Sequence, residues 1–405
     1  MKVAIIGGGA AGFFAAVQAK ANHPKAEVTI FEKAKKLLAK VKISGGGRCN
    51  VTNGCTDIKV LAKAYPRGGK QLKRAFRTFS TPDTMEWFES RGVRLVIQED
   101  NCVFPVSQSS QSIIDCLMLE ARILGVEIAM SIGVKTIERV GEQLELGFGD
   151  KHPAQRMDKV IVATGGSPKR SGLEWLEALG HKIADPVPSL FTFNMPAETV
   201  TKLMGIVVEK ALVSIQGTKL KGDGPLLITH WGMSGPAILK LSAFGARLLS
   251  EMGYEFKVQV NWVNEVNNEL VRKELKAIEV AQANKILANY RPYLLPERLW
   301  HYLLEKRDMP LKKRWGEIGK KGINKLLTVL TNDVYSVKGK TTFKEEFVTC
   351  GGVSLESIDF KTMQSRVCPN LYFAGEVMDI DGITCLLYTS PSPRDATLSR
   401  MPSSA

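Results

Sequence analysis

The N-terminal segment constrains the fold more than any other part of the chain. An apolar run at residues 2–6 leads into GGGAAG at residues 7–12, and a second apolar run at residues 28–31 ends at Glu32, 20 residues after Gly12. This order predicts a strand, a glycine turn, a helix and a second strand. The helix N-terminus of such a unit attracts phosphate groups. We therefore expect dinucleotide binding here; a tight turn in another kind of α/β protein is the alternative.

Each residue type in this segment has a distinct expected contact. Gly7 permits the tight turn, Gly9 lets the backbone approach a pyrophosphate, and Gly12 lets the helix pack closely against the strand. Glu32 accepts hydrogen bonds from ribose hydroxyls, and its negative charge disfavours a 2′-phosphate at that place. The residues of this segment that we expect to contact the cofactor are Gly7, Gly9, Ala10, Ala11, Gly12, Glu32 and Lys33.

Two later segments also end an apolar run at a glycine. Residues 161–166 read IVATGG and include Thr164 and Gly165, and residues 370–376 read NLYFAGE and end at Gly375 and Glu376. If all three runs are strands of one parallel sheet, their carboxyl ends meet at the edge where open α/β sheets bind ligands. A contact more than 300 residues after the first glycines favours an extended FAD over NAD. We expect Glu376 to accept a hydrogen bond from a ribitol or ribose hydroxyl.

A glycine-rich segment at residues 42–53 reads KISGGGRCNVTN. Its small residues let main-chain N–H groups approach a cofactor, Arg48 supplies a cation to a phosphate or to the flavin ring, and Asn50 donates to a ring carbonyl. Without a second cysteine at C-x-x-C spacing, Cys49 is interpreted as a packed thiol. The alternative is a flexible loop with an exposed arginine. The further expected contacts are Ser44, Gly45, Gly46, Arg48, Cys49, Asn50 and, through its backbone at the adenine, Val134.

These segments carry a family resemblance, which residues 103–107 (VFPVS), 229–236 (THWGMSGP), 351–353 (GGV) and 375–379 (GEVMD) extend. Together they resemble the signature of the BaiN/YhiN-type flavoproteins, also called aminoacetone-oxidase-like. The order of the glycine turns is similar to that of glutathione-reductase-type flavoproteins. The resemblance implies an α/β fold in which a Rossmann-like FAD-binding domain carries an inserted β-barrel plus helical module. It also implies an FAD-dependent, NAD(P)/FAD-type oxidoreductase.

The character of the chain changes near residues 186–188, where PVP precedes short strand-like runs. We expect a discontinuous FAD-binding domain at residues 1–188 and 343–384, and an inserted β-rich and helical domain at residues 189–342. The family pattern then continues with Gly-Gly-Tyr/Phe-Asn and a closing helix, whereas residues 386–405 are rich in Ser and Pro. We interpret residues 386–405 as a non-native, disordered tail. We therefore expect weaker FAD binding than in a relative that has the closing helix.

Composition limits the other possibilities. No apolar run reaches the ~18 residues that a membrane span needs. The N-terminal glycines do not fit a signal peptide, so we expect a cytoplasmic protein. The seven cysteines form no C-x-x-C pair and the five histidines are dispersed, so no metal site is predicted.

The net charge of +14 includes an acid-free basic run from Lys63 to Arg77. We interpret this run as solvated helix faces rather than as a nucleic-acid interface. The expected function is an FAD-dependent oxidoreductase that acts on a small organic substrate, with NAD(P)H as a transient electron donor. Two alternatives stay open: a basic RNA-binding or RNA-modifying flavoprotein, and an O₂-using amine oxidase. The sequence assigns no catalytic side chain and no oligomeric state.

Overall fold

The computed structural model describes residues 1–149, 152–341 and 348–383. Backbone contacts divide the chain into two compact units. Unit 1 comprises Met1–Ser189 and the chain from Lys344 onward, and unit 2 comprises Leu190–Phe343. Unit 1 is therefore built from two separate stretches of sequence. Residues 386–405 lie outside the described residues, so the disordered tail and its effect on FAD binding stay predictions.

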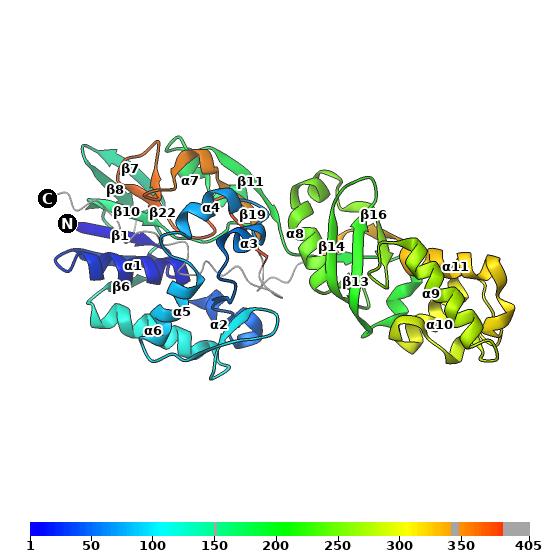
Figure 1. The fold of residues 1–405 in the computed structure, drawn as a ribbon. Helices are drawn as coiled ribbons and strands as arrows, with labels where there is room; N and C mark the ends of the chain where they lie inside the picture. The colour runs from blue at the N-terminus through cyan, green and yellow to red at the C-terminus, as the bar shows by residue number, and fades with distance from the viewer. Residues whose placement is uncertain (150–151, 342–347, 384–405) are drawn as a thin grey trace. The chain divides into compact units, whose positions relative to one another are not determined.

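Unit 1 is organised around a seven-stranded sheet in the order β20-β21-β22-β10-β1-β2-β6 (Figure 1). Strands β22, β10, β1, β2 and β6 run parallel, and β21 pairs antiparallel with both β20 and β22. The strands are β1 (Lys2–Ile6), β2 (Glu27–Glu32), β6 (Glu127–Met130), β10 (Lys159–Val162), β20 (Ile358–Asp359), β21 (Gln364–Ser365) and β22 (Leu371–Phe373). The three apolar runs before the glycine turns are thus parallel strands of one sheet, as predicted, and the structure makes them neighbours.

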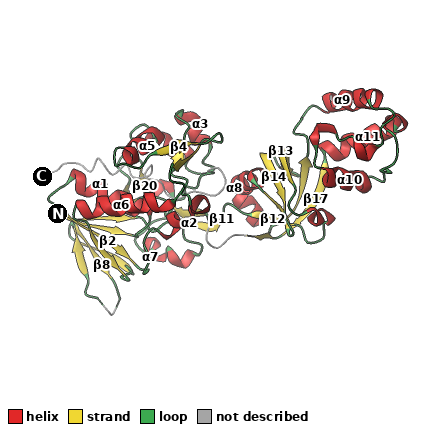
Figure 2. Cartoon of the chain, turned by 90° about the horizontal axis from the view of Figure 1, so that it is seen from below, coloured by secondary structure: helices red, strands yellow, loops and turns green. Residues whose placement is uncertain are grey.

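Both faces of this sheet are covered, which explains the nearly continuous apolar character of its central strands. Helices α1 (Ala10–Asn22) and α6 (Ser110–Ile123) lie along one face (Figure 2), where Val3 and Ile5 are buried. On the other face, Ala4 and Ile6 pack with a three-stranded sheet of β7 (Thr136–Val140), β8 (Gln143–Gly147) and β9 (Gln155–Met157). Alternate residues of β1 therefore serve two different cores.

The remaining elements of unit 1 are short. A second three-stranded sheet has the order β3-β5-β4, and β11 pairs antiparallel with β19. Helix α5 begins at Thr81, where Asp83 closes a capping box with Ser80. The bounds are α2 (Ala39–Gly47), β3 (Thr52–Asn53), α3 (Ile58–Lys63), α4 (Gly69–Ala75), α5 (Thr81–Glu89), β4 (Leu95–Ile97), β5 (Cys102–Pro105), α7 (Glu174–Glu177), β11 (Ile183–Pro188) and β19 (Thr349–Val353).

Unit 2 contains a seven-stranded antiparallel sheet in the order β17-β16-β13-β14-β15-β12-β18. Its strands are β12 (Thr192–Asn194), β13 (Val207–Ile215), β14 (Lys221–Ile228), β15 (Gly232–Ser234), β16 (Glu255–Asn261), β17 (Asp333–Lys338) and β18 (Lys340–Thr341). Within the described residues, β17 and β18 are the two edges of this sheet and do not pair with each other. The expected closed barrel is therefore not confirmed: the inserted module has an open sheet.

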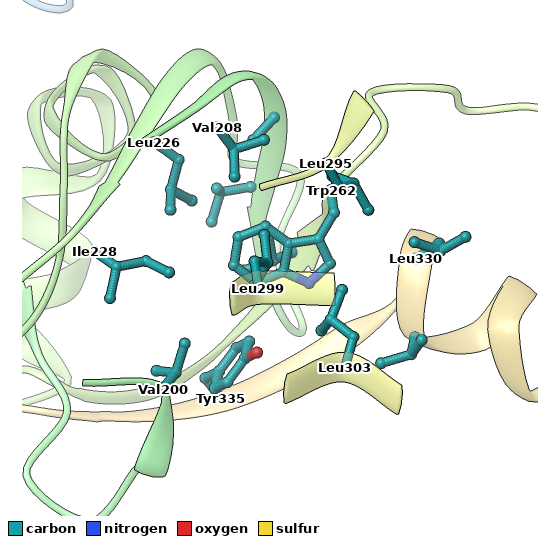
Figure 3. Close-up of a cluster of buried hydrophobic side chains, with 14 of the residues drawn as sticks. Val200, Val208, Leu226, Ile228, Trp262, Leu295, Leu299, Leu303, Leu330 and Tyr335 are labelled. Carbon is teal, nitrogen blue, oxygen red and sulfur yellow. The ribbon is translucent and has the colours of Figure 1, made fainter. Parts of the chain in front are cut away.

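The helices of unit 2 are α8 (Pro236–Glu251), α9 (Asn268–Ala281), α10 (Glu297–Lys306) and α11 (Gly319–Thr331). Each has one apolar face, and together with the sheet they enclose a single large core. Figure 3 shows Trp262, which directly follows β16, and Tyr335 of β17 packed with Leu299 and Leu303 of α10. The buried Asp333 carboxylate accepts a hydrogen bond from Trp262 Nε1 at 3.1 Å. None of the helices that the structure describes is both long and apolar enough to cross a membrane.

Candidate cofactor-binding site

Three glycine turns meet at the carboxyl edge of the unit 1 sheet. Main-chain hydrogen bonds continue past the strand ends, from Ala163 N to Ile6 O at 2.8 Å and from Ala374 N to Val162 O at 2.9 Å. Because β1, β10 and β22 are adjacent and parallel, Gly7, Thr164 and Gly375 follow neighbouring strand ends. The structure thus brings together segments that are separated by more than 150 residues in the sequence.

The first turn shows a different constraint at each of its three glycines. Gly7 has φ +115°, a region that favours glycine, and an added Cβ there would overlap the Ala163 carbonyl. At Gly12 an added Cβ would overlap the Gly7 carbonyl oxygen, so the third glycine permits the contact between α1 and β1. At Gly9 an added Cβ meets nothing within 4 Å. Gly9 is also the N-cap of α1, and no side chain caps the helix that begins with Ala10 and Ala11. The positive end of the helix dipole is therefore open to an anion.

Glu32 lies at the end of β2, directly beside this turn. Its Oε2 accepts a hydrogen bond from Gly8 N at 2.7 Å, and its Oε1 accepts one from Ala34 N at 2.7 Å. These two bonds fix the carboxylate and leave each oxygen able to accept one more donor. Lys33 is exposed. The segment before Val134 runs beside it, because Ile132 N donates to Glu32 O at 3.0 Å.

The glycine-rich segment breaks helix α2 at Ser44, Gly45 and Gly46, whose φ and ψ angles are not helical. Ser44 is buried, and its hydroxyl donates to Val41 O at 2.9 Å. Gly46 has open space where a Cβ would lie, whereas Gly45 packs against the Phe104 ring. The Arg48 guanidinium lies over the Phe104 ring at 4.0 Å from its centroid, and it donates to Gly45 O at 3.2 Å. The loop is thus held by side-chain contacts.

The next two residues of the segment are both buried. Cys49 is buried, and burial raises the pKa of its thiol to about 11, so it is a protonated, packed thiol at neutral pH. Asn50 is also buried, and its amide faces the main chain of Thr52 and Val103. The main-chain polar groups of β3 and β5 need partners in a buried place. The expected contact between Asn50 and a ring carbonyl stays a prediction.

The second and third turns bring in two residues that sequence reasoning missed. Glu376 is almost fully buried, and its Oε2 lies 3.4 Å from Lys40 Nζ of α2. An added Cβ on Gly166 would lie 2.9 Å from the Thr349 Oγ1 atom and 3.7 Å from the Glu376 Cβ. Thr349 is buried, and its hydroxyl has no hydrogen-bond partner in the described part of the chain. No local pattern marks either Lys40 or Thr349.

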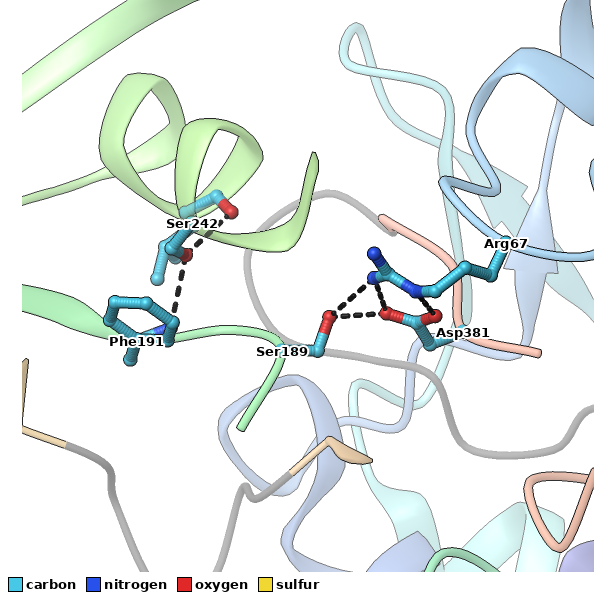
Figure 4. A network of polar contacts seen from close by, with 6 residues as sticks. Arg67, Ser189, Phe191, Ser242 and Asp381 are labelled. Atoms are coloured by element: carbon cyan, nitrogen blue, oxygen red, sulfur yellow. Dashed lines mark hydrogen bonds and ion pairs between the residues drawn. The ribbon is translucent and has the colours of Figure 1, made fainter. Parts of the chain in front are cut away.

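A largely buried ion pair fixes the chain that follows β22 (Figure 4). The Arg67 guanidinium donates to both oxygens of the Asp381 carboxylate, and the Ser189 hydroxyl donates to the same group. Burial lowers the pKa of the Arg67 guanidinium, but its hydrogen bonds to Asp381 and the charge of that carboxylate outweigh burial and raise the pKa above its ordinary value, so Arg67 stays protonated. Arg67 belongs to the basic run that we expected to be a solvated face; the structure leaves its side chain only 13% exposed and pairs it with Asp381.

These features fit a bound dinucleotide. The main chain is open at Gly9, Gly46 and Gly165, where an added Cβ meets nothing within 4 Å. An uncapped helix N-terminus offers N–H groups to a pyrophosphate. The Glu32 carboxylate has acceptor capacity to spare, and the partnerless Thr349 hydroxyl lies beside the second glycine turn. A buried hydroxyl without a partner is rare in a folded protein, and a ligand atom is one way to satisfy it.

Three relatives match the chain along nearly its whole length. It is 26% identical to a 3-dehydro-bile acid delta(4,6)-reductase of Clostridium scindens, with 94% of each chain covered. It is 30% identical to a ribosomal RNA dihydrouridine synthase of Escherichia coli K12 and 27% identical to one of Haemophilus influenzae, with 93% of this chain and 92% of each relative covered.

The match to a family model includes all of the strand ends and glycine turns described above. The model of the HI0933-like protein Rossmann domain matches residues 1–385. The chain therefore belongs to the HI0933-like family, the BaiN/YhiN type, and is an FAD-dependent oxidoreductase.

Proposed function

We propose that this protein reduces a carbon–carbon double bond conjugated with a carbonyl group, and that its substrate is a uracil ring in RNA. The names of the relatives describe the same chemistry on different molecules. A 3-oxo steroid with 4,6-unsaturation and a uridine each carry a double bond conjugated with a carbonyl. In both, the named reaction adds hydrogen across that bond. The names therefore support the type of reaction more strongly than they support either substrate.

The charge of the chain favours RNA between these two substrates. A net charge of +14 exceeds what one small anionic steroid would need for binding, whereas many cationic side chains can neutralise the phosphates of a nucleic acid. Two relatives, one of them 30% identical over 93% of this chain, are named for an RNA substrate. Our expectation that nucleic acid is not a partner is weakened accordingly. The steroid-type substrate remains the second candidate because of the Clostridium scindens relative.

The observation that carries the redox part of the proposal is the meeting of three glycine turns at one sheet edge. We propose that the N-terminus of α1 binds the FAD pyrophosphate and that Glu32 accepts hydrogen bonds from the adenosine ribose. Glu376 and Thr349 offer an acceptor and a hydroxyl at the third and second turns. When bound, FAD supplies hydride transfer. The residues of the chain orient the ring and hold charge near it.

NAD(P)H is the proposed electron donor, docking transiently because the sequence has no second G-x-G-x-x-G. The test begins with purified protein, saturated with FAD and reduced anaerobically with NADH or NADPH. A uridine-containing ribosomal RNA fragment is then added, and the return of the oxidised flavin absorbance is followed. Dihydrouridine in the recovered RNA is measured in parallel by mass spectrometry.

The expected result is anaerobic reoxidation by RNA, with dihydrouridine formed in proportion. Reoxidation by a 4,6-unsaturated 3-oxo steroid, and not by RNA, would assign the second candidate. Bleaching of the flavin by an amine and recovery only with O₂ would instead identify an oxidase. If the protein takes up no FAD at all, the oxidoreductase function itself is contradicted.

A further inference from the structure

Helices α3 and α4 and the turn that follows α4 carry six exposed cations. Within residues 58–82 there is no acid, and Asp57 is used as the N-cap of α3. The exposed cations are Lys59, Lys63, Lys70, Lys73, Arg74 and Arg77, and we call them the α3–α4 basic surface. None of them forms an ion pair with a residue in the part of the chain that the structure describes. Arg67 does not belong to this surface, because it is largely covered and pairs with Asp381.

The spacing of these cations places most of them on one side. Lys70, Lys73 and Arg74 lie at i, i+3 and i+4 on one face of α4. Arg77 follows at i+7 in the turn after the helix, where its N–H donates to Arg74 O at 3.2 Å. The opposite side buries Leu72. Seven residues at 1.5 Å rise span about 10 Å, a length over which one nucleic-acid strand presents about three phosphates. Like charges at these spacings repel one another, and a polyanion relieves this repulsion.

The same helices lie against the chain that leaves the third glycine turn. Ile383 N donates to Ala64 O at 2.6 Å. An added Cβ on Gly68 would lie 2.5 Å from Ile380 Cγ1, so the α4 N-terminus touches this segment directly. The Arg67–Asp381 ion pair is a third contact between the α3–α4 region and this segment. The basic surface is thus fixed to the segment that begins at Gly375 and Glu376, at the candidate cofactor site.

We propose that the α3–α4 basic surface binds the phosphodiester backbone of the RNA substrate and holds the target nucleotide beside the cofactor site. This inference rests on the proposed function. It assigns the affinity for RNA to a defined surface of unit 1 and not to the net charge of the whole protein. The helical part of unit 2 is also basic, so the two possibilities make different predictions.

The test compares two quadruple variants of the full-length FAD-bound protein. One is Lys70→Ala, Lys73→Ala, Arg74→Ala and Arg77→Ala. The matched control removes four exposed cations of unit 2: Lys276→Ala, Lys312→Ala, Lys320→Ala and Lys321→Ala. Binding of a fluorescein-labelled, uridine-containing RNA hairpin is measured by anisotropy over a series of NaCl concentrations. Flavin absorbance and the thermal midpoint show that both variants are folded and loaded.

In the α3–α4 variant, the slope of log K against log salt should become shallower by about three, since each phosphate contact contributes roughly 0.7–0.9 to the slope. Affinity at physiological salt should fall at least about tenfold, and KM for RNA should rise more than kcat falls. The control should keep the wild-type slope within about one unit. Reduction of FAD by the nicotinamide should be equal in both variants.

The outcomes separate this inference from the proposed function. If the wild type forms dihydrouridine and the α3–α4 variant keeps its RNA affinity, RNA does not bind at the basic surface, and the proposed function stands. If the wild type binds RNA through this surface but forms no dihydrouridine, the RNA-binding role of the surface stands and the proposed reaction is wrong. Equal losses in both variants, no RNA binding by the wild type, or binding to phosphatidylglycerol vesicles in place of RNA each overturn the inference.

Discussion

At the residue scale, the glycines of the first turn differ in what an added methyl group would meet. A methyl group on Gly12 would overlap the Gly7 carbonyl, whereas a methyl group on Gly9 would meet nothing within 4 Å. This difference distinguishes Gly12, a glycine that the fold requires, from Gly9, a glycine that a bound ligand would require. The sequence pattern alone treats the two glycines as equal members of one motif.

We predict that Gly12→Ala lowers the unfolding free energy of the FAD-free protein by about 1–3 kcal/mol, because the added methyl overpacks the contact between α1 and β1. Gly9→Ala should leave that stability nearly unchanged and abolish tight FAD binding, because its methyl points into open space that a pyrophosphate would use. Urea unfolding without FAD and titration with FAD measure the two effects. A Gly9→Ala protein with wild-type FAD affinity would contradict the assignment.

The partnerless hydroxyl of Thr349 leads to a second prediction at this scale. Replacing it with the isosteric valine removes a desolvated polar atom, so the FAD-free protein should become more stable, by up to about 1–2 kcal/mol. Affinity for FAD should fall at the same time. Thr52→Val is the matched control, since its buried hydroxyl is also without a partner in the described residues. It should stabilise the protein and leave FAD affinity as it is; a Thr349→Val protein that behaves in the same way would refute the role of Thr349.

At the element scale, a buried histidine links the segment after α7 to β21. His181 Nδ1 donates to Leu176 O at 2.9 Å, and its Nε2 accepts from the Ser365 hydroxyl at 2.7 Å. Ser365 Oγ already accepts from two main-chain N–H groups, so its proton points to the imidazole. Burial lowers the pKa of His181, although the bond to Leu176 partly opposes this. The ring is therefore neutral in the folded protein.

A neutral buried histidine predicts a loss of stability in mild acid. The unfolded chain protonates His181 near pH 6.5, whereas the folded protein does so only at lower pH. Stability should therefore be fully present above about pH 7 and decrease as the pH falls through 6.5. His181→Gln should be less stable at pH 7.5 but should lose less between pH 7.5 and 5.5, as measured by urea unfolding. The exposed His152→Gln control should follow the wild type. An identical pH profile in His181→Gln would exclude this linkage.

At the scale of the whole molecule, the two units have separate hydrophobic cores. The cores of unit 1 lie on the two faces of its parallel sheet, and unit 2 has one core between its sheet and its helices. The three glycine turns and Glu32 belong to unit 1. A ligand that binds there stabilises the elements it contacts.

We therefore predict a local pattern of protection in hydrogen exchange. FAD should slow amide exchange in peptides covering residues 7–12, 161–166 and 371–377, and should leave residues 256–262 of unit 2 unchanged. ADP is the matched ligand, because it should protect residues 7–12 but not residues 371–377. Protection by ADP at all three turns, or by FAD at the first alone, would show that no extended cofactor connects them.

Much of the fold of unit 1 could be predicted because its signals are local. The turn at Gly7, the helix after it and the acid at Glu32 all lie within one βαβ unit. The barrel was an expectation taken from the resemblance. Strand pairing across unit 2 joins distant residues, such as Thr192 and Thr341, and the sequence pattern does not encode which edges pair.

The chain's own sequence determined that a glycine turn, a helix and an acid follow in the order that a dinucleotide needs, because spacing along one βαβ unit fixes those positions. Only the tertiary structure decided that Glu376 meets Lys40 across 336 residues, that Arg67 pairs with Asp381 across 314, and that Thr349 lies beside Gly166. These contacts arise where distant strand ends and helices pack together. Burial, and not residue type, then distinguishes the paired cation from the exposed ones.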